Sequence, residues 1–392
     1  MTKSKLNITS IISFSPTQWG KISSEKSEIG ASSNERSEPS RHRIKGLGFT
    51  KIMYLYLYSG NIIKTFKYLI LLNECMSGRL VVRPDKNEFL LYAMLNALGL
   101  ARGNPDSHLL RRRTVDHFEG YSGLGLKQED YIHHSKPVGY VLTINEAPDF
   151  SEKQSLTLDS CMQREVEIGR AVLPHLKHFY QNTDFENFYQ KALPRYAEEC
   201  EFLQGILDRA NVRDLLDNVW EVDRPFNMEV IPMPLEGMHS GIGPSVGDTA
   251  YQIVGPPFDY GILHLVAHEG SHPRAKRALE PIADEIAARS HLLKHALHQP
   301  NYPSSYHHWP TCFEEHFIRA MQVGYIDPVL AVNSDVENRL KREEKGQGML
   351  FIRDFYDELR KHKESPTGPL TDVALTVLGR LDQYKAKAPF TN

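Results

Sequence analysis

Cysteine is scarce in this sequence. Four cysteines occur among 392 residues, far apart and with no pair at CxxC spacing: Cys75, Cys161, Cys200 and Cys312. A thiolate zinc site needs closely spaced cysteines to preorganise its ligands, so this kind of metal site is excluded. A disulfide framework is not expected in so long a chain with so few cysteines. The cysteine content fits a reducing compartment, and we expect a cytoplasmic protein.

Long apolar runs and an excess of charge of one sign are also lacking. The most apolar stretch, residues 50–73, is interrupted by Ser59, Gly60 and Lys64, whereas a membrane span needs about 20 consecutive apolar residues. The same stretch is too broken, and too far from the start, for a secretory signal. The net charge of −3 shows no bias toward nucleic acid or an anionic membrane. We therefore expect neither a membrane span nor a nucleic-acid partner.

The first part of the chain lacks a hydrophobic pattern. Residues 1–48 are rich in Ser, Lys, Glu and Gly and show no apolar periodicity. Such a composition cannot bury enough apolar surface to offset the entropy of the chain, which predicts disorder. A coherent globular pattern begins only after Met76. We interpret residues 1–75 as a disordered or non-native N-terminal extension, with Met76 as the physiological start.

Apolar residues recur at helical spacing over most of the remaining chain. This spacing predicts helices over residues 86–100, 165–180, 185–208, 212–219, 261–276, 280–298, 311–326, 335–345, 348–362 and 370–385. Residues 226–232 and 249–254 are typical of strands, and a loop rich in Gly, Pro and Ser (238–247) separates them. The predicted fold class is α+β, predominantly helical, with a small sheet that precedes the helix at 261–276. We divide the chain after Met76 into a mostly helical part (76–225), a core (226–330) and a C-terminal helical segment (331–392).

Histidine is abundant, with 18 residues, many of them between 264 and 316. His268 and His272 are four residues apart, which places both imidazoles on one helix face about 6 Å apart, where they can share one tetrahedral ion. Glu269 would point toward the open side of that ion and could take a proton from metal-bound water. This arrangement is the physical content of the HExxH pattern. The sequence predicts Zn²⁺ bound by His268 and His272, with Glu269 as the general base.

The residues around this motif support a helix. An apolar run at 262–267 favours helix, and Pro273 predicts a kink or a break directly after the second ligand. The strand at 249–254 lies at the distance at which zincins place the edge strand that pairs with an extended substrate. His264 is one turn before His268 and too far from His272 to share its ion, so we expect it to pack nearby instead.

The third ligand is less clearly marked. A histidine of the HExxHxxGxxH pattern would fall at Ala278, which excludes the metzincin arrangement. A carboxylate from a later helix is the remaining common arrangement, and the candidates are Glu280, Glu285, Glu314 and Glu315. Thr311 to Glu314 matches a capping box, which would give Glu314 a structural role at the helix start. The apolar stripe of that helix lies nearer Glu314, but we predict Glu315 as the ligand, with Glu314 as the alternative.

Three runs of this sequence, TAYQIVGPP, HLVAHEGSHP and HHWPTCFEEHFIRAM, resemble the signature of an uncharacterised family of gluzincin-like domains. Its members pair the HExxH helix with a later Glu-x-x-x-Arg-Ala helix, here Glu315 to Ala320, which also favours Glu315. The resemblance spans residues 80–330 and is specific only around these runs. It implies a zincin-like core and a metallopeptidase that acts on a peptide or protein substrate. Thermolysin-like enzymes have an Asp where this chain has Arg319, so the residues that orient the histidines must differ.

The predicted function is therefore that of a zinc-dependent hydrolase, a metallopeptidase of the gluzincin type. Several side chains could supply a second donor to the oxyanion, and the sequence does not choose among Tyr251, Tyr306, His307, His308 and Tyr325. One alternative is a non-catalytic protein in which zinc is structural or the groove only binds peptide. Glu269 argues against it, since a purely structural site does not need that carboxylate. A second alternative is a helical interaction protein with an accidental HExxH.

Overall fold

The computed structural model describes the following residues: 78–99, 108–123, 125, 135–153, 163–247, 249–303, 306–332, 335–366 and 368–383. All of them belong to one compact unit of the chain, Phe66–Asn392. The predictions made for residues 1–75, including a physiological start at Met76, lie outside the described residues.

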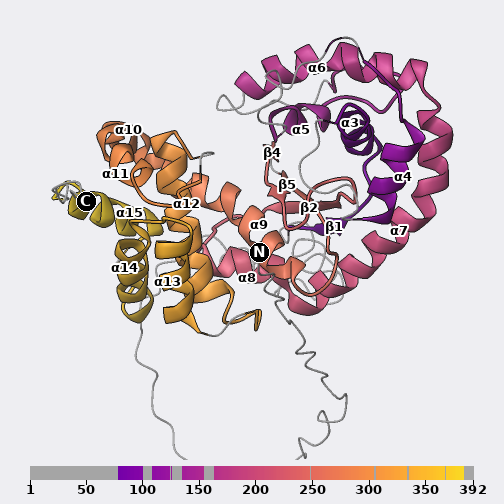
Figure 1. Cartoon of the computed structure of the whole chain (residues 1–392). Helices are drawn as coiled ribbons and strands as arrows, with labels where there is room; N and C mark the ends of the chain where they lie inside the picture. Colours follow the sequence, from indigo (N-terminus) through magenta and orange to yellow (C-terminus); the bar gives the residue numbers. More distant parts are fainter. Residues whose placement is uncertain are drawn as a thin grey trace, which may run out of the picture. The chain divides into compact units, whose positions relative to one another are not determined.

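A small mixed sheet lies at the centre of the fold (Figure 1). Strands β1 (Leu80–Val82), β2 (Asn227–Pro232) and β5 (Thr249–Val254) are parallel, and β3 (Gly241–Ile242) and β4 (Ser245–Val246) pair with β5 in the antiparallel sense. The sheet order is β1-β2-β5-β3, with β4 also on β5. The prediction that residues 249–254 form the edge of the sheet is therefore wrong. The loop rich in Gly and Pro folds back as β3 and β4 and covers that edge.

Most helices of the N-terminal half pack on one side of this sheet, whereas residues 203–219 join the apolar cluster on its other side. The helices of this half are α3 (Lys86–Ala97), α4 (Leu109–His117), α5 (Ser135–Val141), α6 (Gln163–Asn182), α7 (Phe185–Ala210) and α8 (Val212–Val219). The start of α3 is fixed by Asp85, whose Oδ1 accepts a hydrogen bond from the backbone N–H of Glu88 at 2.9 Å. Figure 1 shows the long helices α6 and α7 curving around α3 and α4.

The second half of the described chain is almost entirely helical. It contains α9 (Ile262–Leu279), η4 (Glu280–Ile282), α10 (Ala283–Ala287), η5 (Ser290–Leu292), α11 (Leu293–Leu297), α12 (Trp309–Met321), the π-helical turn η6 (Gln322–Ile326), α13 (Val336–Gly346), α14 (Ile352–Glu364) and α15 (Leu370–Leu381). Residues 280–298 form four short pieces, so the single helix predicted there is wrong. No described helix combines the length and the apolar character that crossing a membrane requires.

Two details of the helix ends differ from the predictions. For Pro273 the sequence predicts a kink or a break, and no break forms, because the helix continues to Leu279. A proline removes one backbone donor, but tertiary packing can still hold the helix together. The capping box at Thr311 does not form. Helix α12 begins one turn earlier, with His308 as its N-cap and a proline in its first turn, so that Thr311 and Glu314 lie inside the helix.

The sheet separates two apolar clusters. Met228, Val230 and Val254 face a cluster that includes residues of α9, α12 and α14, whereas Ile231 and Ile253 face a cluster built around α3 and the first part of α7. This division follows from the alternation of side chains along a strand. The C-terminal helices α13 to α15 contribute to the same cluster as α9 and α12. The two helices that carry the predicted ligands are therefore built on one common core.

The described part of the chain is mostly helical with a small mixed sheet. The predicted fold class, a predominantly helical α+β fold, is confirmed at this level. As predicted, the sheet precedes α9 in the chain. The sequence did not predict the short strands β3 and β4.

Candidate metal centre

The two residues between Glu269 and His272 hold helix α9 against the sheet and against the end of α8. The Ser271 hydroxyl accepts a hydrogen bond from the indole N–H of Trp220 at 3.0 Å. A Cβ on Gly270 would lie 2.8 Å from the side-chain amide of Gln252 on β5, so only glycine allows this close approach. Both residues are buried. Their packing fixes the rotation of α9 and turns the side chains of His268 and His272 away from the sheet.

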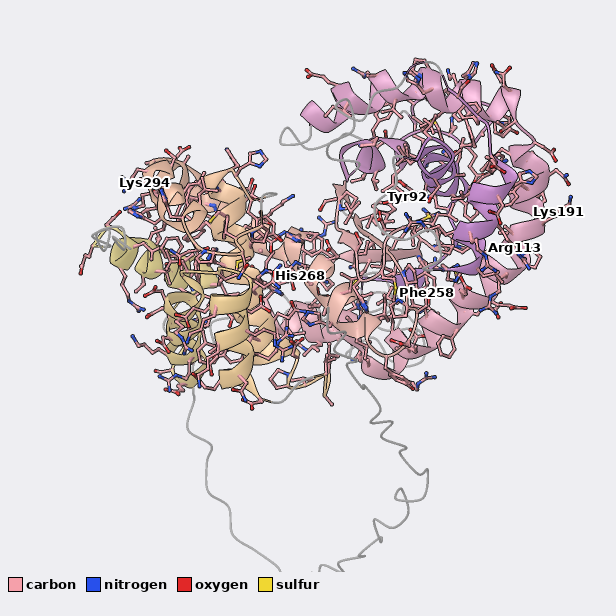
Figure 2. All side chains as sticks on the ribbon, viewed as in Figure 1. Tyr92, Arg113, Lys191, Phe258, His268 and Lys294 are labelled. Atoms are coloured by element: carbon pink, nitrogen blue, oxygen red, sulfur yellow. The ribbon has the colours of Figure 1, made fainter. Side chains whose placement is uncertain are left out.

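The structure brings His268, His272 and Glu315 together: one ligand atom from each lies within 4.8 Å of the others. His268 Nε2 is 3.6 Å from Glu315 Oε2, and His272 Nε2 is 3.5 Å from Glu315 Oε1. Two ligands that are each about 2.1 Å from a tetrahedral ion lie about 3.4 Å apart, so the three residues fit one zinc ion. Figure 2 shows His268 where α9 passes between the N-terminal and C-terminal helices.

The other carboxylates considered as ligands lie elsewhere. Glu280 and Glu285 are exposed, on η4 and α10. Glu314 contacts His272 from the far side of the ring, with Oε1 2.8 Å from Nδ1. Glu314 therefore neither caps α12 nor joins the cluster of three, and it orients one of the imidazoles instead.

Both histidines have an oxygen acceptor at Nδ1. Glu314 takes this role for His272, and the amide Oε1 of Gln322 lies 3.1 Å from His268 Nδ1. An acceptor at Nδ1 places the proton on that nitrogen and leaves the Nε2 lone pair free. The two free lone pairs point toward Glu315. In the neutral form each ring therefore has the tautomer that a zinc ligand requires. Burial lowers the pKa of His272, but the carboxylates of Glu314 and Glu315 outweigh it and raise that pKa to about 9, so this ring gives up a proton when it binds an ion.

The sequence analysis missed both of these orienting residues. Gln322 follows Glu315 by seven residues, two helical turns, and this spacing was a usable signal because it places both on one helix face. Glu314 was misassigned because the start of α12 was placed too late. Gln322 opens the single π-helical turn η6, a feature that often occurs at functional sites.

His264 belongs to the network that holds Gln322, and it is not part of the ligand cluster, as the sequence predicted. Its backbone carbonyl accepts a hydrogen bond from Gln322 Nε2 at 2.7 Å. Its ring Nδ1 lies 3.0 Å from Oδ1 of the buried Asp327, whose other oxygen is 3.2 Å from Arg339. The orientation of His268 is thus fixed through Gln322 to a buried ion pair.

Arg319 contacts the carboxylate of the cluster. Its Nε donates to Glu315 Oε2 at 3.3 Å, and its Nη1 donates to Glu343 at 2.8 Å. Burial raises the pKa of Glu315, but the positive charges of the neighbouring histidines and of Arg319 outweigh it and hold that pKa well below its usual range. The carboxylate is therefore ionised, as a metal ligand must be. In this chain the residue four positions after the glutamate supports the carboxylate and does not orient a histidine.

Glu269 lies beside the cluster with a buried side chain, and its Oε2 is 3.9 Å from His272 Nε2. Burial raises the pKa of Glu269, although the charges of His272 and His268 partly offset this effect. A carboxylate whose pKa is moved toward neutrality is a better proton acceptor than an exposed one. The position and the electrostatics of Glu269 both suit a general base.

Two glycines of the β3–β4 segment press against Glu269. A Cβ on Gly241 would lie 2.7 Å from Glu269 Oε1, and one on Gly243 would lie 3.0 Å from Oε2 and 2.6 Å from the backbone carbonyl oxygen. That carbonyl has no helical donor, because the residue four positions later is Pro273. Glycine is therefore required at both positions for the edge of the sheet to reach the carboxylate.

Tyr306 is the candidate oxyanion donor that contacts the cluster network. Its hydroxyl oxygen accepts a hydrogen bond from Arg319 Nη2 at 3.3 Å. Burial and the charge of Glu315 raise the pKa of Tyr306 above its usual value, so the phenol keeps its proton. Its O–H is therefore available as a donor beside the predicted ligands.

The other four candidates lie in different surroundings. Tyr251 packs against the apolar cluster of α3, on the opposite face of the sheet from α9. Tyr325 faces α14, where the Lys363 ammonium lies 6.0 Å from its ring centre. His307 and His308 are exposed at the start of α12. These positions favour Tyr306.

The chain was also compared with known proteins. It matches no family model, no curated protein and no solved structure. The resemblance to gluzincin-like domains therefore stays a prediction, carried by three runs of sequence.

Proposed function

We propose that this protein is a zinc-dependent hydrolase, a metallopeptidase with a zincin-like core. One observation carries the proposal. The Nε2 atoms of His268 and His272 converge on Glu315 while both Nδ1 atoms are occupied by oxygen acceptors, and Glu269 lies beside the convergence point. Two nitrogens and a carboxylate form the ligand set of catalytic zinc sites, which keep a fourth position open.

Zinc would be held by His268, His272 and Glu315, and when bound it supplies a Lewis acid that lowers the pKa of a coordinated water toward about 7. Glu269 accepts the proton of the attacking water on its carboxylate and delivers it to the leaving amine. Tyr306 donates its O–H to the negative charge that develops on the carbonyl oxygen. Arg319 positions that phenol and keeps Glu315 ionised.

A peptide substrate suits the edge of the sheet. Strand β3 ends the sheet path among the described strands, and its Gly241 lies against Glu269. An extended peptide can add to such an edge through backbone hydrogen bonds. We therefore propose that the substrate pairs with β3, and not with β5, so that its backbone lies next to the proposed general base.

In the non-catalytic alternative, the protein binds zinc but does not hydrolyse a substrate. Structural zinc sites are normally closed by a fourth protein ligand, and the described cluster offers three. The buried carboxylate of Glu269 is also not needed for binding. These two observations favour a hydrolase. The reading of HExxH as accidental predicts a protein without stoichiometric zinc.

The test compares two variants of the purified full chain, Glu269→Gln and His268→Ala. Glu269→Gln should keep zinc and lose peptide hydrolysis by about 10²–10⁴-fold, because it removes the proton acceptor and leaves the ligands. His268→Ala should lose both. Elemental analysis gives the zinc content, and a mixed peptide library gives the hydrolysis rate. Glu285→Gln, an exposed position on α10, is the control. Equal hydrolysis by wild type and Glu269→Gln would refute the general-base role, and a zinc-free wild type would refute the site.

A further inference from the structure

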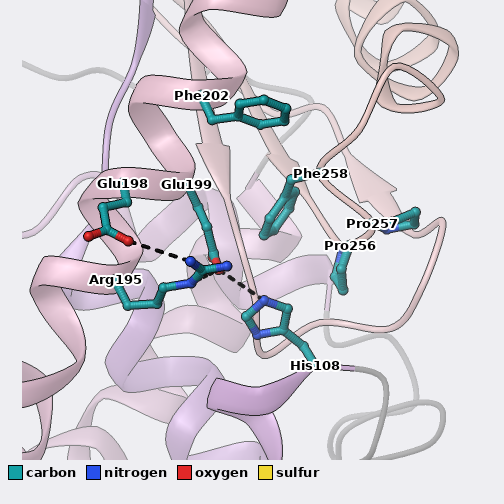
Figure 3. A pocket seen from close by; sticks show the side chains of 8 residues that line it. All are labelled: His108, Arg195, Glu198, Glu199, Phe202, Pro256, Pro257 and Phe258. Atoms are coloured by element: carbon teal, nitrogen blue, oxygen red, sulfur yellow. Dashed lines mark hydrogen bonds and ion pairs between the residues drawn. The ribbon is translucent and has the colours of Figure 1, made fainter. Parts of the chain in front are cut away.

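A second site lies between α7, the start of α4 and the loop after β5 (Figure 3). It is a cavity of about 470 Å³, lined by His108, Arg195, Glu198, Glu199, Phe202, Pro256, Pro257 and Phe258. The lining residues do not include His268, His272, Glu269 or Glu315. The cavity is therefore distinct from the candidate metal centre, and nothing in the proposed hydrolysis uses it.

One wall of the cavity is apolar. Phe202 projects from α7 with 55% of its surface exposed, and Phe258 and two prolines face it from the loop after β5. Two more exposed apolar residues lie on segments next to this wall. Tyr260 follows Phe258 by two residues and is hydrogen-bonded to Arg209 of α7. Met238 precedes His239, whose backbone N–H donates to the carbonyl of Pro256. Grouped exposed apolar side chains of this size are typical of binding sites.

The other wall is polar and partly buried. Glu199 is only 6% exposed, and its Oε1 receives both His108 Nε2 at 3.1 Å and Arg195 Nε at 2.8 Å. Its Oε2 is buried and has no hydrogen-bond partner. His108 Nδ1 accepts the backbone N–H of Leu110 at 3.2 Å. Nε2 is therefore the ring nitrogen that donates to Glu199.

The charged groups of this wall are two carboxylates and one guanidinium. Glu198 and Glu199 both pair with Arg195, and the Glu198 side chain is 69% exposed whereas Glu199 is buried. An organic cation in the cavity would add a second positive partner for the two carboxylates, and the faces of two phenylalanine rings attract cations as well.

We propose that this cavity binds a monocation carried on an apolar body, an ammonium or guanidinium group attached to an alkyl or aromatic group. The cationic group lies toward Glu199 and the apolar body lies between Phe202 and Phe258. The same chemistry is offered by a basic side chain of a peptide and by a free amine. The proposal does not depend on zinc or on hydrolysis.

The experiment measures binding to the full chain by isothermal titration calorimetry. Three probes share one aromatic body: phenethylammonium, the neutral 2-phenylethanol and the anionic phenylacetate. Phenethylammonium should bind at least about tenfold more tightly than 2-phenylethanol, and phenylacetate should not bind. A blocked tripeptide with a central lysine is the fourth probe. If it binds more tightly than phenethylammonium, the natural ligand is a basic side chain; the reverse order assigns a free amine. Equal binding of the charged and neutral probes, or no binding of any, overturns the proposal.

Two variants locate the binding. Phe202→Ala changes an exposed side chain and should fold, and it should weaken phenethylammonium binding about tenfold. Glu199→Gln removes the buried charge and should abolish the preference for phenethylammonium over 2-phenylethanol. Leu375→Ala, an exposed apolar position on α15, is the matched control and should bind as wild type does. Unchanged binding in Phe202→Ala refutes the site even if Glu199→Gln fails to fold.

Discussion

Among the described residues, the candidate metal centre and the cavity beside α7 are two places where histidine meets a buried glutamate, and they differ in what the second ring nitrogen does. At the candidate metal centre the Nδ1 atoms of His268 and His272 are occupied by side-chain oxygens, so both Nε2 lone pairs are free. In the cavity beside α7, His108 donates a hydrogen bond from Nε2 to Glu199 and accepts one at Nδ1 from a backbone N–H. His108 has no lone pair left for a metal. A histidine near a carboxylate becomes a candidate ligand only when its other nitrogen finds an acceptor.

The largest expected effect separates the two histidine environments directly. His272→Ala should remove zinc and hydrolysis together, because two ligands do not hold the ion as three do. His108→Ala should keep both, because its ring has no free lone pair. Zinc content and peptide hydrolysis of the two purified variants check this. Loss of zinc from His108→Ala would mean that the two sites are not distinct in the way we describe.

The aromatic residues also differ between the two places. Tyr306 lies beside the candidate metal centre, whereas Phe202 and Phe258 line the cavity. Tyr306→Phe should lower kcat by about 10²–10³-fold without loss of zinc, because it removes one donor to the oxyanion and no ligand. Tyr260→Phe, two residues after Phe258 in the chain, should leave kcat unchanged. Steady-state kinetics on one peptide substrate gives both values. An unchanged kcat in Tyr306→Phe would remove the phenol from the mechanism.

Replacing an oxygen acceptor at a histidine Nδ1 should have a smaller effect on the site than replacing a ligand. Glu314→Gln should weaken zinc binding about 10–100-fold, because it loses the charged acceptor that fixes the His272 ring. Glu198→Gln, at the cavity, is the matched control and should leave zinc affinity unchanged. Competition with a chelator measures both affinities. If the two variants bind zinc equally well, Glu314 has no orienting role.

The smallest expected effect concerns Glu88, a buried glutamate for which the structure shows no histidine partner among the described residues. Both of its carboxylate oxygens are buried without a hydrogen-bond partner, and burial raises its pKa well above the usual value. Folding therefore favours the protonated form, and the free energy of unfolding should fall as pH rises from about 5 toward the raised pKa. Glu88→Gln should lack this fall and be more stable at about pH 8, by about 1–3 kcal/mol. Urea unfolding at several pH values measures it, and parallel pH profiles would contradict it.

The spacing of apolar residues was sufficient to predict those helices and strands that are determined mainly by neighbouring residues in the sequence. Residues 212–219 and 249–254 form a helix and a strand with the predicted bounds, and the four-residue spacing of His268 and His272 places both rings on one face of α9. These features depend on periodicity, which a single sequence contains. The cluster that the structure forms contains Glu315, but the choice of Glu315 over Glu314 came from the resemblance and from a capping box that does not form.

The remainder depended on contacts that the sequence does not express. Strands β3 and β4 are two residues each and exist only because they pair with β5, so a loop was predicted. The capping pattern at Thr311 was outcompeted by an earlier start at Trp309. Gln322 contacts His268 and His264, and Tyr306 contacts Arg319. The seven-residue spacing from Glu315 predicts the helix face of Gln322, but the partners of both side chains are set by tertiary packing.

The cluster draws its ligands from two helices, α9 and α12, and the short pieces from η4 to α11 lie between them in the chain. An ion shared by His272 and Glu315 would act as a cross-link that closes this segment into a loop. Cross-links of this kind restrict the unfolded chain, and binding to the folded state alone adds stability in proportion to the logarithm of free ligand. A chelator should then loosen the segment from Glu280 to Leu297 before the sheet, so the ion would serve the architecture as well as the chemistry.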